Sequence, residues 1–526
     1  MFPRLRPAAR SLRPSTPRRI STTPVRSAKH DAARADQAAY QASLAAAKRR
    51  WWLQQGIILA GVIGFGYTGY LLGQSLAPPK IQMQGLLPIA AADKLLEKTQ
   101  PQYGSVANYR ECILEIAELF EKRGKRDRVS TDEDDLRTHG VSDWSYHEAE
   151  LPTVVVWVDS TEEVQDIVRL ATKFRVPITP FSGGTSLEGH FASPFGGISL
   201  DVSLMDKVLS ISEADGEAVC QPGVKWEDLN AQLVKEGIPL FFPIDPGPGA
   251  TLGGMAGTGC SGTNAVRYGT AKGEWFLNLT VVLPTGEVIK TRSKARKSSA
   301  GWDATKIFLG AEGTLGIVTE CTVKLAPLLP TKVAVMNFPG VEEAVKAATE
   351  IVNAGYPVQC VEYLDSRTMK AINAGGIAGK TYPEQDSLFF KFQGTDGMMT
   401  ETAKGVSVIA AKHGGKDMQF SKSDADAEKL WEGHGNVHTL ALFSDDEELE
   451  RVRVAVHEMV ERAIRLGGTC SGEHGVGLGK IEYLPMELGA GTVNFMEGIK
   501  RYVDPYNLFN PGKVYPNIKP QRPKKD

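Results

Sequence analysis

The sequence predicts an α+β protein in two parts, preceded by one transmembrane helix. Residues 51–76 contain no charged side chain and are long enough to span a bilayer as a helix. Residues 152–327 contain short predicted strands and helices separated by two loops that are rich in glycine. From residue 331 onward, predicted strands alternate with helices, which is typical of a compact α+β domain. A chain of 526 residues is long enough for two or three domains.

The amino-terminal region has the composition of a mitochondrial transit peptide. Residues 1–50 carry twelve Lys and Arg but only two Asp and Glu. An Arg-rich, Ser-rich and acid-poor segment is typical of such a peptide. The uncharged segment that follows begins with two tryptophans, which favour a membrane interface, directly after Lys48-Arg49-Arg50. We predict a transit region over 1–50 and a helix over 51–76 in the mitochondrial inner membrane, with the body of the protein facing the intermembrane space.

The charge of the chain is unevenly divided. Its formal net charge is −2, but residues 1–50 carry +10 and the other 476 residues carry −12. A nucleic-acid-binding protein carries its positive charge on the folded domain, so this distribution argues against a nucleic-acid partner. The six cysteines include no CxxC pair, which excludes a cysteine-rich zinc site and a disulfide-dense secreted domain. We predict that they are buried thiols.

The glycine-rich loops predict a site for a phosphate-bearing ligand. Residues 182–190 (SGGTSLEGH) follow a predicted strand over 176–181, and residues 243–270 contain the densest run of glycine. Glycine permits close approach of the backbone and positive φ, so the N–H groups of such loops can face a diphosphate. The absence of a GxxxxGK[ST] motif argues against an NTPase. A GxGxxG match at 64–69 follows no strand and lies in the predicted membrane helix, so we reject it as a dinucleotide site.

Several long segments carry a specific family resemblance. They are residues 180–190, 243–270, 298–320, 471–480 and 504–514. Together they resemble the FAD-linked oxidases of the vanillyl-alcohol oxidase/p-cresol methylhydroxylase superfamily, and within it the mitochondrial D-lactate dehydrogenase (cytochrome) group. The resemblance implies a two-lobed FAD-binding domain of vanillyl-alcohol oxidase type with a ferredoxin-like α+β cap. The predicted boundaries are an N-terminal connector over 80–146, the FAD-binding domain over 147–327, and the cap or substrate domain over 328–526, which returns to the flavin at its C-terminus.

The same resemblance implies which residues bind FAD, noncovalently. The diphosphate would be held by residues 182–186 and by the 246–254 loop. The full predicted set is Ser182, Gly183, Gly184, Thr185, Ser186, Gly189, His190, Pro246, Gly247, Thr251, Gly253, Gly254, Gly257, Ser261, Glu312, Gly316, Ile317 and Asn510. For His190 the alternatives are a hydrogen-bonded loop histidine and a covalent flavin link. For Asn510 the alternative is a simple Asn-Pro turn.

A second set of residues predicts the chemistry. Glu473-His474 lies between glycines, where a loop can present both side chains. Glu473 with His434 and His438 supplies the carboxylate and imidazole ligands that a divalent metal takes. The resemblance implies that this metal, Zn²⁺ or Mn²⁺, polarises the substrate and that His474 is the catalytic base. The implied reaction is oxidation of D-lactate, or a similar D-2-hydroxy acid, to pyruvate or its analogue, with electrons passed to cytochrome c.

The chain departs from the family pattern near Trp431. Related proteins carry a long segment between a Trp-Glu pair and the histidine motif, whereas Trp431-Glu432 runs directly into GHGNVH at 433–438. His434 is therefore either the first metal histidine or the replacement of an Asp. The missing segment would also supply a basic residue for the substrate carboxylate, and neither Lys429 nor Arg451 can be assigned to that role. Two alternatives stay open, namely a D-2-hydroxyglutarate dehydrogenase and a catalytically impaired flavoprotein.

Overall fold

The computed structural model describes residues 103–142, 145–375, 381–421, 426–427, 431 and 446–518. The predicted transit region and transmembrane helix lie outside these residues, and so do His434 and His438. Within the described part of the chain, no helix has both the length and the apolar character needed to cross a membrane. All elements below belong to one compact unit, residues 95–526.

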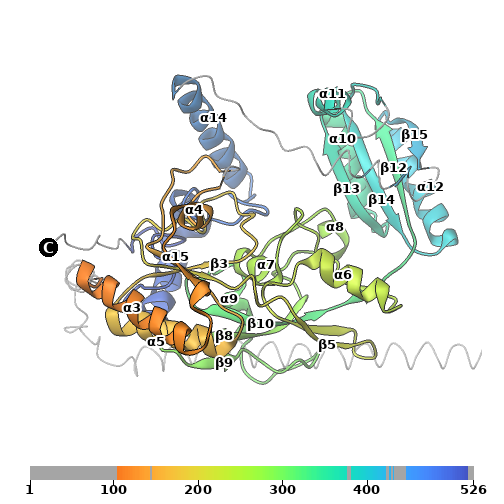
Figure 1. The fold of residues 1–526 in the computed structure, drawn as a ribbon. Coiled ribbons are helices and arrows are strands. Elements are labelled where there is room, and N and C mark those ends of the chain that lie inside the picture. Colours follow the sequence, from red (N-terminus) through yellow and green to blue (C-terminus); the bar gives the residue numbers. More distant parts are fainter. Residues whose placement is uncertain are drawn as a thin grey trace, which may run out of the picture. The chain divides into compact units, whose positions relative to one another are not determined.

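The first lobe is a four-stranded sheet of order β1-β2-β4-β3, packed against helices α3 and α5 (Figure 1). Helix α5 is capped at both ends: the Ser160 side chain accepts a hydrogen bond from the N–H of Glu163 at its start, and Arg175 ends it with φ of 55°. Strands β2 and β3 both run parallel to β4. The first glycine-rich loop, 182–190, directly follows the carboxyl end of β3. The elements are α3 Val106–Lys122, η1 Arg126–Arg128, β1 Val129–Ser130, α4 Glu133–Thr138, β2 Val154–Trp157, α5 Thr161–Phe174, β3 Ile178–Phe181 and β4 Ile198–Asp201.

The second lobe is an antiparallel sheet of order β5-β6-β10-β8-β9. Strands β8 and β9 form a hairpin, in which the N–H of Gly286 donates to the carbonyl of Leu283 at 2.8 Å. Helices α6 and α7 bury their apolar residues against β6, β8 and β10, while Val282 and Ile317 join the core of the first lobe. The elements are β5 Val208–Ser212, β6 Glu217–Cys220, α6 Trp226–Lys235, β7 Leu240–Phe241, α7 Leu252–Thr258, α8 Ala265–Tyr268, β8 Phe276–Val282, β9 Val288–Lys290, α9 Thr305–Phe308, β10 Ile317–Lys324 and β11 Ala326–Pro327, with β7 and β11 paired as a separate ribbon.

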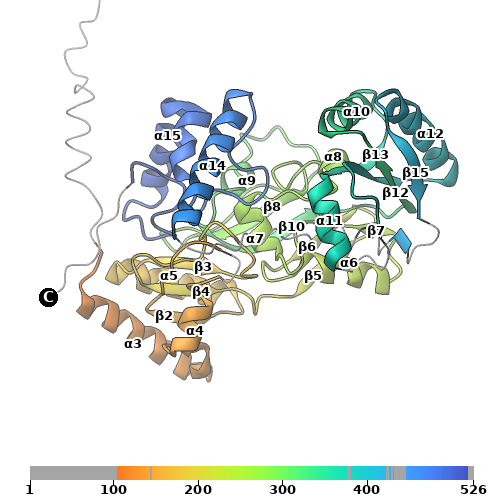
Figure 2. The same ribbon diagram turned by 90° about the horizontal axis from the view of Figure 1, so that it is seen from above.

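The cap contains an antiparallel sheet of order β13-β14-β12-β15. Its chain order is β-α-β-β-α-β with α11 inserted after the second strand, which is the split β-α-β pattern. Helices α10 and α12 lie together on one face of this sheet (Figure 2) and bury Ala334, Phe390 and Phe392. The elements are β12 Thr331–Asn337, α10 Val341–Asn353, β13 Val358–Leu364, α11 Ser366–Gly375, β14 Ser387–Gln393, α12 Asp396–Lys412 and β15 Lys416–Phe420.

The C-terminal segment returns to the first lobe. After α14 (Asp446–Arg465), η2 (Ile481–Tyr483) and α15 (Leu484–Val503), Phe509 forms a parallel bridge with Ile178 of β3. The N–H of Asn510 donates to the carbonyl of Ile178 at 2.7 Å. The segment around Phe509 is therefore built into the edge of the first sheet.

Candidate active site

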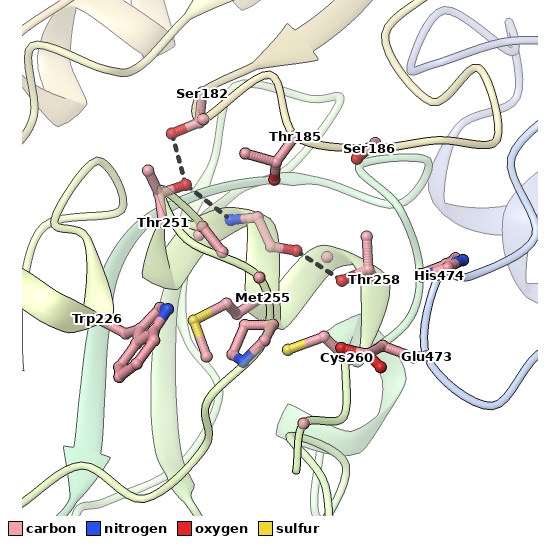
Figure 3. Close-up of a pocket in the computed structure, with 18 of the residues that line it drawn as sticks. Ser182, Thr185, Ser186, Trp226, Thr251, Met255, Thr258, Cys260, Glu473 and His474 are labelled. Atoms are coloured by element: carbon pink, nitrogen blue, oxygen red, sulfur yellow. Dashed lines mark hydrogen bonds between the residues drawn. The ribbon is translucent and has the colours of Figure 1, made fainter. Parts of the chain in front are cut away.

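A cavity of about 2040 Å³ lies between the two lobes and the cap. This is about twice the upper end of the volume range for sites that hold drug-sized ligands. The two glycine-rich loops, the start of α7 and the loop with Glu473 and His474 line it together (Figure 3). The cavity therefore has room for a large cofactor and a second, smaller molecule.

The residues predicted to bind the cofactor line this cavity, with two exceptions, Gly189 and Ser261. Gly189 faces another loop: a Cβ atom there would lie 3.0 Å from the Leu478 side chain. Helix α7 ends at Gly259 with φ of 65°, and Cys260 rather than Ser261 then lines the cavity. For the whole predicted set, a role in binding FAD stays a prediction.

The glycine-rich loops touch each other at their tips. The hydroxyls of Ser182 and Thr251 are 2.8 Å apart, and Thr251 Oγ1 accepts the N–H of Gly254 at 3.4 Å (Figure 3). Gly183 is required at this contact, since a Cβ atom there would lie 2.8 Å from the carbonyl oxygen of Gly249. Three buried polar atoms in the cavity wall, Trp226 Nε1, Glu227 Oε2 and His190 Nδ1, have no hydrogen-bond partner. Two glycine-rich loops in contact can surround a diphosphate, and the unpartnered polar atoms can bond to a ligand. Both features suit an extended, polar cofactor such as FAD.

One wall of the cavity is held by the buried carboxylate of Glu312. Its Oε1 accepts the N–H of Val476 at 2.6 Å and its Oε2 accepts that of Gly477 at 2.8 Å. His190 Nε2 lies 3.2 Å from the same Oε2. Burial alone would raise the pKa of Glu312, but His190 and these two N–H groups outweigh it and lower the pKa. Glu312 thus fixes the position of the loop that follows Glu473 and His474.

Asn510 and Lys513 extend this network from the C-terminus. The Asn510 side chain donates to the carbonyls of Glu312 at 2.7 Å and His190 at 3.1 Å. Its Oδ1 accepts Lys513 Nζ at 2.9 Å, and Lys513 also donates to the carbonyl of Ala192. Asn510 does line the cavity, as the sequence predicted, but its polar atoms are used to join three segments of chain.

The loop with Glu473 and His474 is shaped by the glycine at 475. That residue has φ of 78°, and a Cβ atom there would lie 2.7 Å from Glu312 Oε1. Glu473 is half-buried and close to the thiol of Cys260 (Figure 3). Burial and the nearby Asp245 raise the pKa of Glu473. The side chain of His474 is exposed and lines the cavity.

The predicted metal site is only partly described by the structure. Glu473 is in the cavity wall, but His434 and His438 lie outside the described residues. Across the residues that the structure does describe, no group of three or more His, Cys, Asp or Glu side chains could hold a metal ion. The structure therefore brings Glu473 and His474 to the cavity and leaves the other two predicted ligands unplaced.

Sequence reasoning missed four charged residues of the cavity, namely Glu227, Asp245, Glu362 and Lys391. Asp245 follows the strand-like segment at the start of the second glycine-rich loop, and its carboxylate accepts Thr263 Oγ1 at 2.6 Å and the N–H of Asn264 at 2.9 Å. Glu362 and Lys391 come from neighbouring cap strands. A lysine inside the apolar run LFFKF was a signal that could have identified one of them.

Comparison with known proteins agrees with this geometry. The family model described as an FAD binding domain matches residues 152–292. The model described as the C-terminal domain of FAD linked oxidases matches residues 330–434 and 432–514, so its two segments meet where the chain departs from the expected pattern. Fold and site thus define an FAD-dependent oxidoreductase.

The relatives narrow this class to a family. The chain is 37% identical to the mitochondrial D-lactate dehydrogenase [cytochrome] of Arabidopsis thaliana, over 77% of this chain and 80% of that protein. It is 33% identical to the Kluyveromyces lactis enzyme of the same name, over 87% and 89% of the two chains. The chain belongs to the family of mitochondrial D-lactate dehydrogenases (cytochrome).

Solved structures show the same fold at low identity. p-Cresol methylhydroxylase aligns with a TM-score of 0.63 at 16% identity, covering 79% of this chain and 98% of that one. A 4-ethylphenol oxidase from Gulosibacter chungangensis aligns with a TM-score of 0.61 at 19% identity, over 80% and 99%. The predicted two-lobed fold of vanillyl-alcohol oxidase type is confirmed at this level.

Proposed function

We propose that this protein oxidises D-lactate, or a similar D-2-hydroxy acid, to the corresponding 2-oxo acid with FAD as its cofactor, and that the electrons pass to cytochrome c. The observation that carries the proposal is the placement of Glu473 and His474 in one cavity with both glycine-rich loops. The names of the relatives in Arabidopsis thaliana and Kluyveromyces lactis support the substrate and the class of acceptor.

FAD would be held by the two glycine-rich loops, with Trp226, Glu227 and His190 offering the unpartnered polar atoms. When bound, it supplies an acceptor for the hydrogen and two electrons that leave C2 of the substrate. His474 takes the proton of the substrate hydroxyl at an imidazole nitrogen, so that the carbonyl forms as the C2–H bond breaks. Glu312 fixes the position of the His474 loop relative to the glycine-rich loops, because its carboxylate accepts the N–H groups of Val476 and Gly477.

A divalent cation, Zn²⁺ or Mn²⁺, on His434, His438 and Glu473 is a finer part of this proposal. Its support from the described residues is the chemistry of Glu473, a half-buried carboxylate whose pKa is raised by burial and by Asp245. A cation would neutralise this pair of negative groups.

The mitochondrial location is proposed on the same footing. The relatives carry the word mitochondrial in their names, and residues 1–50 have the composition of a transit region. The uncharged segment 51–76 directly after Lys48-Arg49-Arg50 supports a helix in the inner membrane with the body in the intermembrane space. The domain boundaries at 146/147 and 327/328 are proposed from the order of the sequence motifs.

The test is reduction of the purified flavoprotein without oxygen. D-lactate should bleach the flavin absorbance within seconds, while L-lactate should not, and D-2-hydroxyglutarate should act more slowly. Faster bleaching by D-2-hydroxyglutarate would assign the other substrate. A yellow protein that no D-2-hydroxy acid reduces would show that the shortened segment near Trp431 has abolished catalysis.

A further inference from the structure

The inner face of the cap sheet is unusual because it carries charge. Alternate residues of a strand point to opposite faces, and in β14 Leu388, Phe390 and Phe392 are buried beneath α10 and α12. Lys391 therefore belongs to the opposite face, which is lined by Thr331, Val333 and Glu362 at the cavity. Its nearest neighbours on this face, Val333 across the strand pair and Phe389 along the strand, are buried and apolar.

Lys391 has no carboxylate partner. Among the described residues it forms no ion pair and no hydrogen bond, and its Nζ lies 5.3 Å from the centre of the Trp431 ring. The charge of Asp245 acts on Lys391, but both oxygens of Asp245 are already engaged by Thr263 and Asn264. Within the described lining of the cavity, Lys391 is the only lysine or arginine. A half-buried, unpaired cation of this kind is costly unless an anion meets it.

The position of Lys391 is fixed from the second lobe. Two residues further along β14, the carbonyl of Gln393 accepts Arg267 Nη1 at 3.1 Å, and its side chain accepts the hydroxyl of Tyr268. On the adjoining strand, Gln359 donates to Asn264 at 2.8 Å. Helix α8 thus fixes strands β13 and β14 of the cap relative to the second lobe. The position of the Lys391 ammonium group in the cavity is fixed with them.

The rest of the cavity wall near the cap is negative. Asp245, Glu362 and Glu473 all line it, and burial raises the pKa of each. Any of these carboxylates that is ionised repels an anionic substrate that enters the cavity. Among the described lining residues, Lys391 supplies the positive charge that offsets this repulsion. Lys391 is then the group on which anion binding should depend most strongly.

We propose that Lys391 binds the carboxylate of the substrate and makes the site selective for 2-hydroxy acids over neutral alcohols. This rests on the proposed function, since it assumes that the substrate is a 2-hydroxy carboxylate. Trp431 supports the side chain of Lys391 and directs its ammonium group, which donates hydrogen bonds to the substrate carboxylate oxygens.

The test compares three variants of the full-length, FAD-loaded protein. Lys391→Met removes the charge at nearly constant volume, Lys391→Arg keeps it, and Lys332→Met removes an exposed lysine one residue from the cross-strand partner of Lys391. Lys391→Met should raise the KM for D-lactate and weaken binding of oxalate, measured by calorimetry, by about 10- to 100-fold, the range for a charge-assisted hydrogen bond. The kcat should change less than KM, and Lys391→Arg should recover most of the oxalate affinity. Lys332→Met should match the wild-type protein.

A neutral substrate separates charge recognition from a structural role. The kcat/KM for D-lactamide should be the same in Lys391→Met as in the wild-type protein. An equal loss for D-lactate and D-lactamide, or unchanged oxalate binding, would overturn the proposal. If D-lactate fails to reduce the wild-type flavin, the proposed function fails by itself, and oxalate calorimetry still decides: oxalate that binds the wild type and not Lys391→Met supports the role of Lys391, and oxalate that binds neither overturns it.

Discussion

The two walls of the cavity treat buried charge in opposite ways. On the Glu312 wall, Glu312, Asn510 and Lys513 are almost fully buried and bonded to backbone or to one another. On the opposite side of the cavity, here called the cap wall, Lys391 of β14 faces the cavity beside Glu473 of the loop before η2; both are half-buried and form no ion pair with each other. Satisfied polar networks stabilise one arrangement of the chain, whereas unsatisfied groups are kept at a cost that a ligand relieves. The difference indicates that the Glu312 wall positions the site and the cap wall recognises what enters it.

The largest expected effect comes from the catalytic base on the loop that joins the two walls. His474→Gln should lower kcat for D-lactate by about 100- to 10,000-fold, because proton transfer from the hydroxyl loses its acceptor. Stopped-flow measurement of flavin reduction checks this, with FAD content and unfolding temperature unchanged. His413→Gln is the matched control, because His413 is not among the residues that line the cavity and pairs with Glu350 at 2.7 Å. A His474 variant with normal flavin reduction would remove this residue from the mechanism.

A substitution at Glu312 should lower the stability of the protein more than it changes the rate of the chemical step. In Glu312→Gln the amide group can accept only one of the two N–H groups of Val476 and Gly477, and the charge beside His190 is lost. We expect a loss of about 2 to 3 kcal/mol in the free energy of unfolding, together with weaker FAD retention. Guanidinium unfolding and the flavin-to-protein absorbance ratio measure both.

The control for that variant is Glu320→Gln. Glu320 contacts Lys290 at 3.2 Å on the surface of β10, where an exposed pair contributes less than about 1 kcal/mol. Equal losses in the two variants would mean that Glu312 has no special structural role.

The Glu312 wall also predicts a pH dependence of stability through Lys513. Burial lowers the pKa of Lys513 to about 7 from its ordinary value of 10.5. Between these two values the unfolded chain binds a proton that the folded protein does not, so the free energy of unfolding should rise with pH by up to about 1.4 kcal/mol per unit. Unfolding curves between pH 7.5 and 9.5 should show a slope that Lys513→Met reduces and Lys332→Met retains. Equal slopes in all three proteins would contradict this.

The smallest effect is expected for a substitution that lies in neither wall of the cavity. It tests whether a loss of stability alone changes FAD retention. Ser160→Ala removes the hydrogen bond from the N–H of Glu163 at the start of α5 and should cost about 1 kcal/mol of stability. Because α5 does not line the cavity, FAD content and the KM for D-lactate should not change. Loss of flavin in this variant would show that general destabilisation, rather than Glu312 itself, controls cofactor retention.

The parts of the molecule that sequence could predict are those set by local chemistry. Helix α5 is specified by its Ser160 cap and its repeating apolar residues, and the loop at 182–186 by glycines that no other residue can replace at a close backbone contact. The Glu312 wall could not be predicted in this way, since Asn510 and Glu312 are 198 residues apart and their contact depends on the completed fold. Lys391 was missed for a related reason: a strand pattern shows which residues share a face, but not which cavity that face closes.

The return of the C-terminal segment determines the order in which the site can be assembled. Asn510 bonds to the carbonyl of His190, 320 residues earlier, and Phe509 bridges to Ile178 at the edge of the first sheet. During synthesis both lobes and the cap leave the ribosome before these residues do. The Glu312 wall can therefore be completed only after residues 509–510 have been synthesised, so cofactor capture has to follow the synthesis of both lobes and of the cap.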